Sequence, residues 1–149
     1  MKQLEIILSL NTKERFSSIE TLYSINIPNG LKQFIVLYEG KQTIQKVYRR
    51  ESGIFDSINQ FLYLDNENKA SIKKIYEGHL FYDIVGFIPF GIDSGGWDYN
   101  YSINPDTFGQ VWLNKFDSGD EDTLEFVCSS FEKFIDGLIT EEEAIKLGY

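Results

Sequence analysis

Sulfur and imidazole are scarce in this chain. It has one cysteine, Cys128, and one histidine, His79, among 149 residues. A single cysteine excludes an internal disulfide framework and fits a reducing compartment. A single histidine with no cysteine beside it argues against a zinc site, and no nucleophile or acid is signalled near it for acid–base catalysis. We therefore expect no metal, no cofactor and no enzymatic activity.

Long apolar runs are also missing. The longest ones, such as residues 34–38, are far too short to cross a bilayer. At the N-terminus Lys2 is followed by Glu5, and no small-residue cleavage site comes after them, so this end is a poor signal peptide. We predict a cytoplasmic protein that has no membrane contact.

Positive charge is in short supply. Fourteen basic residues face twenty-three acidic ones, which leaves a formal net charge of −9. That sign repels phosphate backbones and argues against nucleic-acid binding. It favours and accelerates association with a basic partner, although acidity could also serve only to keep the protein soluble.

Aromatic residues, in contrast, are abundant. They make up 15% of the chain, as twelve Phe, nine Tyr and two Trp. Disordered chains are poor in aromatics, and this length suffices to bury a core. We predict a single domain spanning residues 1–149.

The most informative stretch is residues 87–116, which is typical of three antiparallel strands. Residues 87–90 form a short apolar strand, and a turn with two glycines follows at residues 93–96. Aromatic or apolar side chains then occupy every second position from Trp97 to Ile103, so they share one face of a strand. A turn at residues 104–109 leads to a third strand in residues 110–116. The meander predicts recognition or core-building, because it carries no obvious catalytic machinery.

The segments before this meander change period. Helical spacing predicts a short helix in residues 2–10, a second helix opened by a capping box of Ser17 and Glu20, and a third over residues 31–38 that ends at Gly40. Residues 43–49 and 57–64 then resemble the two strands of a hairpin, joined through a solvated turn at residues 49–53. A helix is expected over residues 70–78.

After the meander comes an acidic turn at residues 117–122. Residues 124–128 alternate as a last strand, and a capping box of Ser129 and Glu132 opens a helix through Leu138. Thr140 and Glu143 repeat that device before a final helix. The element order predicts an α+β fold, in which N-terminal and C-terminal helices pack against a mostly antiparallel sheet.

Several chemical alternatives stay weak. Asp93, Asp98 and Asp106 flank the aromatic strand, and paired carboxylates could support glycoside hydrolysis. The acidic turn lacks the alternating oxygen ligands of a calcium loop, because Gly119 occupies a ligand position. The aromatic row could stack bases, but no basic residues are interleaved with it.

Four segments carry a resemblance to a known family. They are INIPNGLKQFIVLYEG, SINQFLYLDNENKASI, FIPFGIDSGGWDYNYSI and SFEKFIDGL, and together they cover about residues 17–138. In this order and spacing the chain resembles the SUKH superfamily, the Smi/Knr-type domain of many bacterial immunity proteins and of a fungal cell-wall regulator. The matching positions are Pro28, Tyr38, Gly40, Pro89, Phe90, Gly91, Asp93, Gly95, Gly96, Phe131 and Phe134.

The resemblance implies an α+β fold without catalytic residues, and a role in neutralising a cognate toxin, often a nuclease, by direct binding. We expect an immunity protein whose partner is a basic toxin domain. The alternative is a cytosolic regulatory or scaffold module of the same fold, with a small carboxylate-based hydrolase as the third possibility. Oligomeric state stays open.

Acidic turns beside aromatic residues suggest where such a partner would bind. Trp112 alternates with the apolar residues of its strand and is the aromatic expected to be exposed or half-exposed, as interface anchors are. The predicted partner-binding residues are Asp93, Trp97, Asp98, Trp112, Asp117, Asp120, Glu121 and Asp122.

Overall fold

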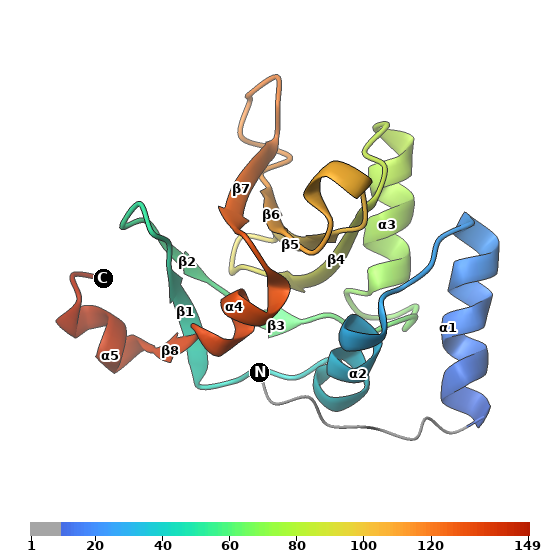
Figure 1. Cartoon of the computed structure of the whole chain (residues 1–149), viewed down its shortest axis with the longest axis horizontal. Helices are drawn as coiled ribbons and strands as arrows, with labels where there is room; N and C mark the ends of the chain where they lie inside the picture. Colours follow the sequence, from blue (N-terminus) through green and yellow to red (C-terminus); the bar gives the residue numbers. More distant parts are fainter. Residues whose placement is uncertain (1–9) are drawn as a thin grey trace.

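A computed structural model describes residues 10–149 of the chain (Figure 1). Two antiparallel sheets and five α-helices make up this part, which is the expected α+β class, although the sequence predicted one sheet. The helices are α1 (Leu10–Tyr23), α2 (Asn29–Tyr38), α3 (Ile72–Phe81), α4 (Phe131–Asp136) and α5 (Glu141–Lys146). The strands are β1 (Gln45–Arg49), β2 (Phe55–Ser57), β3 (Gln60–Phe61), β4 (Phe87–Ile92), β5 (Asp98–Ser102), β6 (Val111–Asn114), β7 (Leu124–Cys128) and β8 (Ile139–Thr140), with a 3-10 turn at Pro105–Thr107.

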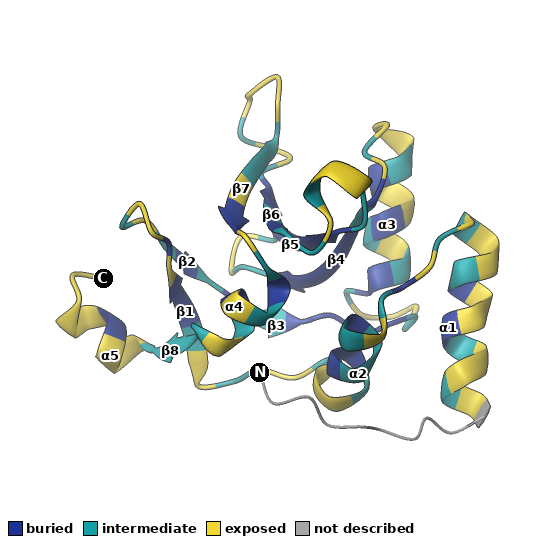
Figure 2. Cartoon of the chain, viewed as in Figure 1, coloured by how far each residue is buried: buried dark blue, intermediate teal, exposed yellow. Residues whose placement is uncertain are grey.

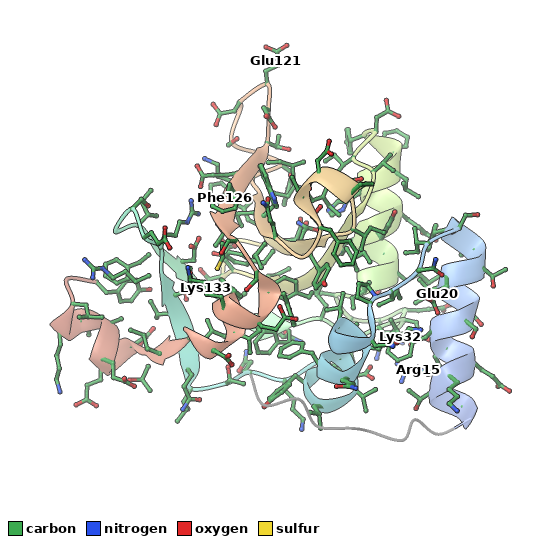
Figure 3. The ribbon with its side chains drawn as sticks, in the orientation of Figure 1. Arg15, Glu20, Lys32, Glu121, Phe126 and Lys133 are labelled. Atoms are coloured by element: carbon green, nitrogen blue, oxygen red, sulfur yellow. The ribbon has the colours of Figure 1, made fainter. Side chains whose placement is uncertain are left out.

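The first described helix differs from its prediction. The helix expected at residues 2–10 lies almost wholly outside the described residues. The predicted capping box is wrong, because Ser17 lies in the middle of α1 and Glu20 forms an ion pair with Lys32 of α2, with a distance of 3.0 Å (Figure 3). That pair joins the two helices, and α2 ends before Gly40, whose positive φ of 72° confirms the expected stop.

The predicted hairpin is split between two sheets. β1 pairs with β2 as expected, but the chain then leaves this sheet, and β3 pairs instead with β4. The small sheet has the order β2-β1-β8, and its third strand comes from the C-terminal part of the chain. The solvated turn is also wrong in part, since Arg50 is buried.

The large sheet has the order β3-β4-β5-β6-β7, so the central meander is confirmed. β5 lies at its middle, and all five of its residues are buried. On one face Tyr99 and Tyr101 pack against Phe134 and Phe131 of α4, with ring centroids 5.7 and 5.4 Å apart. On the other face His79 of α3 contacts Asp98. The polar side of this strand is therefore covered by α3, the helix predicted over residues 70–78, which does not end at Gly78 but continues to Phe81 and so carries His79.

The core lies between the helices and the inner faces of the two sheets, where Figure 2 shows the buried segments of β1, β4, β5 and α2. Phe34 of α2 meets both Phe61 and Phe131 edge to face, at 4.9 and 5.2 Å. The aromatic richness of the sequence thus builds the core.

The C-terminal helices follow the predicted order with one shift. The N-cap of α4 is Ser130 and not Ser129, because the Ser130 side chain accepts a hydrogen bond from the Lys133 backbone N–H at 3.0 Å. The capping box of Thr140 and Glu143 is confirmed at α5. Between α4 and α5 lies β8, a strand that the sequence did not predict. It pairs with β1.

Candidate partner-binding site

Two loops meet at one end of the large sheet. β5 begins and β6 ends there, since Asp98 lies opposite Asn114 in the strand register. The loop before β5 therefore lies beside the loop after β6, and the Trp97 indole N–H donates a hydrogen bond to Asp117 across the gap. The Lys115 ammonium lies 5.8 Å from the centre of the Trp97 ring. The structure thus brings together predicted residues that are twenty or more positions apart in sequence.

The β4–β5 loop is built by Asp93. Its Oδ1 accepts hydrogen bonds from the backbone N–H groups of Gly95 and Trp97, both at 2.9 Å. Gly96 has a φ of +90°, which L-residues rarely adopt. Asp93 is half-buried and holds this turn, so its first role is architectural.

The β6–β7 loop supplies the exposed negative charge. Asp117, Asp120, Glu121 and Asp122 are all exposed, and Figure 3 shows Glu121 at the tip of the loop. Lys115 lies 4.0 Å from Asp120 and 3.4 Å from Glu125. Glu121 and Asp122 form no ion pair with any residue in the range 10–149, which leaves their charge available to a partner.

Behind this loop lies a cleft of about 640 Å³ between α3 and the end of the sheet. Its walls are mostly apolar, its floor is polar, and its rim carries the loop carboxylates. The cleft is lined by Ile75, Gly78, His79, Tyr82, Ile84, Gly96, Asp98, Asn114, Phe116, Glu121, Asp122, Thr123 and Leu124.

The floor of the cleft is a buried hydrogen-bond network centred on Asp98. The His79 Nε2 lies 2.7 Å from Asp98 Oδ2, which also accepts from Asn100 Nδ2 at 2.8 Å. Asn114 Nδ2 lies 3.4 Å from Asp98 Oδ1. Asp98 is only 3% exposed, so its prediction as a partner-binding residue is corrected: the carboxylate is occupied inside the protein by α3 and β6.

His79 lies in the last turn of α3 and is buried. Its Nδ1 faces the Phe87 carbonyl oxygen at 3.1 Å, and a carbonyl only accepts hydrogen bonds. Its Nε2 faces a carboxylate oxygen. Both ring nitrogens of His79 are thus occupied by groups of the protein itself.

Trp112 is half-buried, in agreement with its prediction, but it lies away from the loop tips. It shares the Asp98 side of the sheet and meets Phe87 and Phe126 edge to face, with centroids 6.0 and 5.7 Å away. Phe126 is 46% exposed (Figure 3). Period-2 alternation did not predict that Phe126 is exposed, because β7 has a register shift opposite Val111 and Trp112 that breaks its period.

The remaining candidates are separated in space. Asp106 is exposed in the turn after β5, whereas Asp98 begins that strand and is buried. The three carboxylates of the hydrolase alternative therefore do not converge.

Cys128 is buried with its sulfur 3.0 Å from the Tyr48 hydroxyl. Among residues 10–149 no three His, Cys, Asp or Glu side chains gather in a way that could hold a metal ion. Nor does this range contain a helix with the length and apolar character needed to span a membrane.

Comparison with known proteins agrees with this fold. The sequence profile of the SMI1 / KNR4 family (SUKH-1) matches residues 10–137, most of the chain. The chain therefore belongs to the SMI1 / KNR4 family, which confirms the resemblance drawn from the four segments. Neither the curated proteins nor the solved structures contain a significant match.

Proposed function

We propose that this chain is a cytoplasmic immunity protein that binds a basic toxin domain stoichiometrically and converts nothing chemically. Membership of the SMI1 / KNR4 family fits this role in its coarse form, because immunity proteins occur in that family. The observation that carries the proposal is the convergence of the β4–β5 and β6–β7 loops into one exposed acidic surface beside Trp97.

Charge supports the same role. The net charge of −9 attracts a basic protein at long range, and the exposed carboxylates of the β6–β7 loop concentrate that attraction at one end of the sheet. The half-buried Trp97 provides a rigid apolar anchor beside these carboxylates, and Trp112 with the exposed Phe126 provides a second one further along the sheet. Such a surface would cover the basic active-site face of a toxin, such as a nuclease.

The acid–base groups support binding rather than catalysis. Both ring nitrogens of His79 are occupied inside the protein, which leaves no free nitrogen to take a proton from a substrate. Asp93 is occupied by its own turn.

The experiment is co-expression of the chain with candidate toxin domains encoded beside its gene, followed by purification of the complex. We expect protection of the cells and a stable complex of the two chains. The variant Asp117→Lys/Asp120→Lys should lose protection, while Glu67→Lys/Glu142→Lys, which changes charge equally at two exposed positions elsewhere, should keep it. Equal protection by both variants would place the contact surface elsewhere. A tight complex that gives no protection would favour the regulatory or scaffold alternative.

A further inference from the structure

The cleft behind the β6–β7 loop carries an excess of negative charge. None of the described residues that line it is a lysine or an arginine, and its one histidine pairs with Asp98 inside the protein. Glu121 and Asp122 at the rim therefore leave an excess of negative charge, which faces a space of about 640 Å³. That volume falls within the range of ligand pockets and is large enough to admit a long side chain.

The polar floor of the cleft is occupied within the protein. Asn114 is 3% exposed and lines the cleft, and its Oδ1 accepts no hydrogen bond from any described residue. The orientation of its amide is set by Nδ2, which faces the Asp98 carboxylate. This Oδ1, like that of Asn100, is enclosed by the protein, so the groups that a ligand can reach in the cleft are the rim carboxylates and the aromatic rings of the walls.

The walls of the cleft indicate which positively charged group fits it best. Tyr82 and Phe116 are 75% and 55% exposed and border the cleft on the α3 side and on the β6 side. Aromatic faces favour a planar guanidinium, which also presents five N–H donors and pairs with carboxylates. A lysine ammonium is more strongly hydrated and lacks the planar geometry.

We propose that this cleft receives an arginine side chain of the protein partner. The guanidinium stacks against Tyr82 or Phe116 and pairs with Asp122 or Glu121. This inference deepens the proposed function, on which it rests, by naming the partner group that the acidic end recognises.

The test uses the full chain, labelled with ¹⁵N, and three tripeptides: acetyl-Gly-Arg-Gly-amide, its lysine counterpart and its citrulline counterpart. Citrulline keeps the shape of arginine and removes the charge. We expect saturable amide shifts at Gly78, Gly96 and the Asn114 side chain, with a dissociation constant of about 1–10 mM for the arginine peptide. Lysine should bind about threefold more weakly, and citrulline about tenfold more weakly.

Variants separate the cleft from general electrostatics. Glu121→Gln/Asp122→Asn should weaken arginine binding about threefold to tenfold, and Phe116→Ala should weaken it as well. Glu67→Gln/Glu142→Gln removes the same charge from exposed positions outside the cleft and should leave binding unchanged. Absence of saturable shifts at the three cleft positions, or equal binding of arginine and citrulline, would overturn the proposal.

This experiment needs no toxin, so the two proposals can fail separately. If the arginine peptide binds but no toxin is neutralised, the cleft proposal survives and the immunity function fails. If a toxin complex forms and its affinity is insensitive to Glu121→Gln/Asp122→Asn, the immunity function survives and the arginine proposal fails.

Discussion

Arg50 is the clearest case of a residue whose role depends on distant partners. Its guanidinium makes a two-pronged contact with Asp56, with distances of 2.7 and 2.8 Å, and its Nη1 lies 2.9 Å from Glu125. The Tyr99 hydroxyl donates to the same Asp56 carboxylate at 3.0 Å. Burial, with the neighbouring Asp56 charge, raises the pKa of Tyr99 well above its usual range. The Arg50 cluster therefore joins β2, β5 and β7 at the residue scale.

Removing the Arg50 guanidinium should lower the stability of the protein. Arg50→Met leaves the buried Asp56 carboxylate without its counter-ion, and we expect a loss of about 3–5 kcal/mol in the free energy of unfolding. Urea denaturation followed by tryptophan fluorescence measures this loss. Glu51→Gln is the control, because the ion pair of Glu51 with Lys133 is exposed, and no measurable change is expected. Equal midpoints for wild type and Arg50→Met would contradict this account.

Glu125 should make part of the stability dependent on pH. Partial burial acts to raise its pKa, but the hydrogen bond and charge of Arg50, together with Lys115, lower the net value below that of a free glutamate. A lowered folded-state pKa stabilises the fold above the unfolded pKa of about 4.3, and the contribution is lost as pH falls through the folded-state value.

The corresponding experiment compares urea midpoints of wild type and Glu125→Gln from about pH 7 to about pH 3. The variant should be less stable at neutral pH, and the two curves should converge in acid. A constant difference across this range would show that the glutamate contributes through packing and not through charge.

At the scale of elements, caps decide where helices begin. Two adjacent serines precede α4, and only the Ser130 hydroxyl reaches the Lys133 N–H. We expect Ser130→Ala to lower the free energy of unfolding by about 1 kcal/mol. Ser129→Ala is the matched control and should change little, because Ser129 is exposed and precedes the cap. If urea denaturation showed a larger loss of stability for Ser129→Ala than for Ser130→Ala, the sequence-based assignment of the capping box to Ser129 would be correct.

β5 shows what sequence patterning can and cannot predict for an element. The alternation correctly predicted a strand whose Tyr99 and Tyr101 face the core. It placed Asp98, Asn100 and Ser102 together on the other side of the strand and left their burial open, and the structure shows that all three are buried. Period-2 alternation records which face is apolar, but a helix packed on the second face can bury polar residues when it satisfies their hydrogen bonds. α3 does this through His79.

At the scale of the whole molecule, charge should control how fast a basic partner associates. A net charge of −9 with an exposed acidic loop predicts an association rate that falls steeply as salt rises, because ions screen charges separated by more than about 8 Å at physiological ionic strength. Stopped-flow measurement with the purified toxin domain, from low to high salt, checks this prediction. A dissociation rate that changes instead would assign the charges to short-range contacts.

The two-sheet architecture could not be predicted from local patterns. Residues 57–64 have a strand-like composition, but β2 and β3 choose different partners. β8 pairs with β1 across more than ninety positions, with Val47 opposite Ile139. Such pairings depend on contacts that form only when the chain is folded. The residue pattern of a two-residue strand is too short to predict them.

The sequence by itself determined the α+β class, the central meander, the acidic β6–β7 turn and, through its four characteristic segments, the family. These features depend on local periodicity, turn chemistry and motif order, which are present in the unfolded chain. Only the tertiary structure decided that Asp98 is occupied by His79, that Arg50 is buried, and that Asn114, Tyr82 and Phe116 border one cleft. The physical reason is that burial and hydrogen-bond partners are properties of packed elements, and residues far apart in sequence acquire them together.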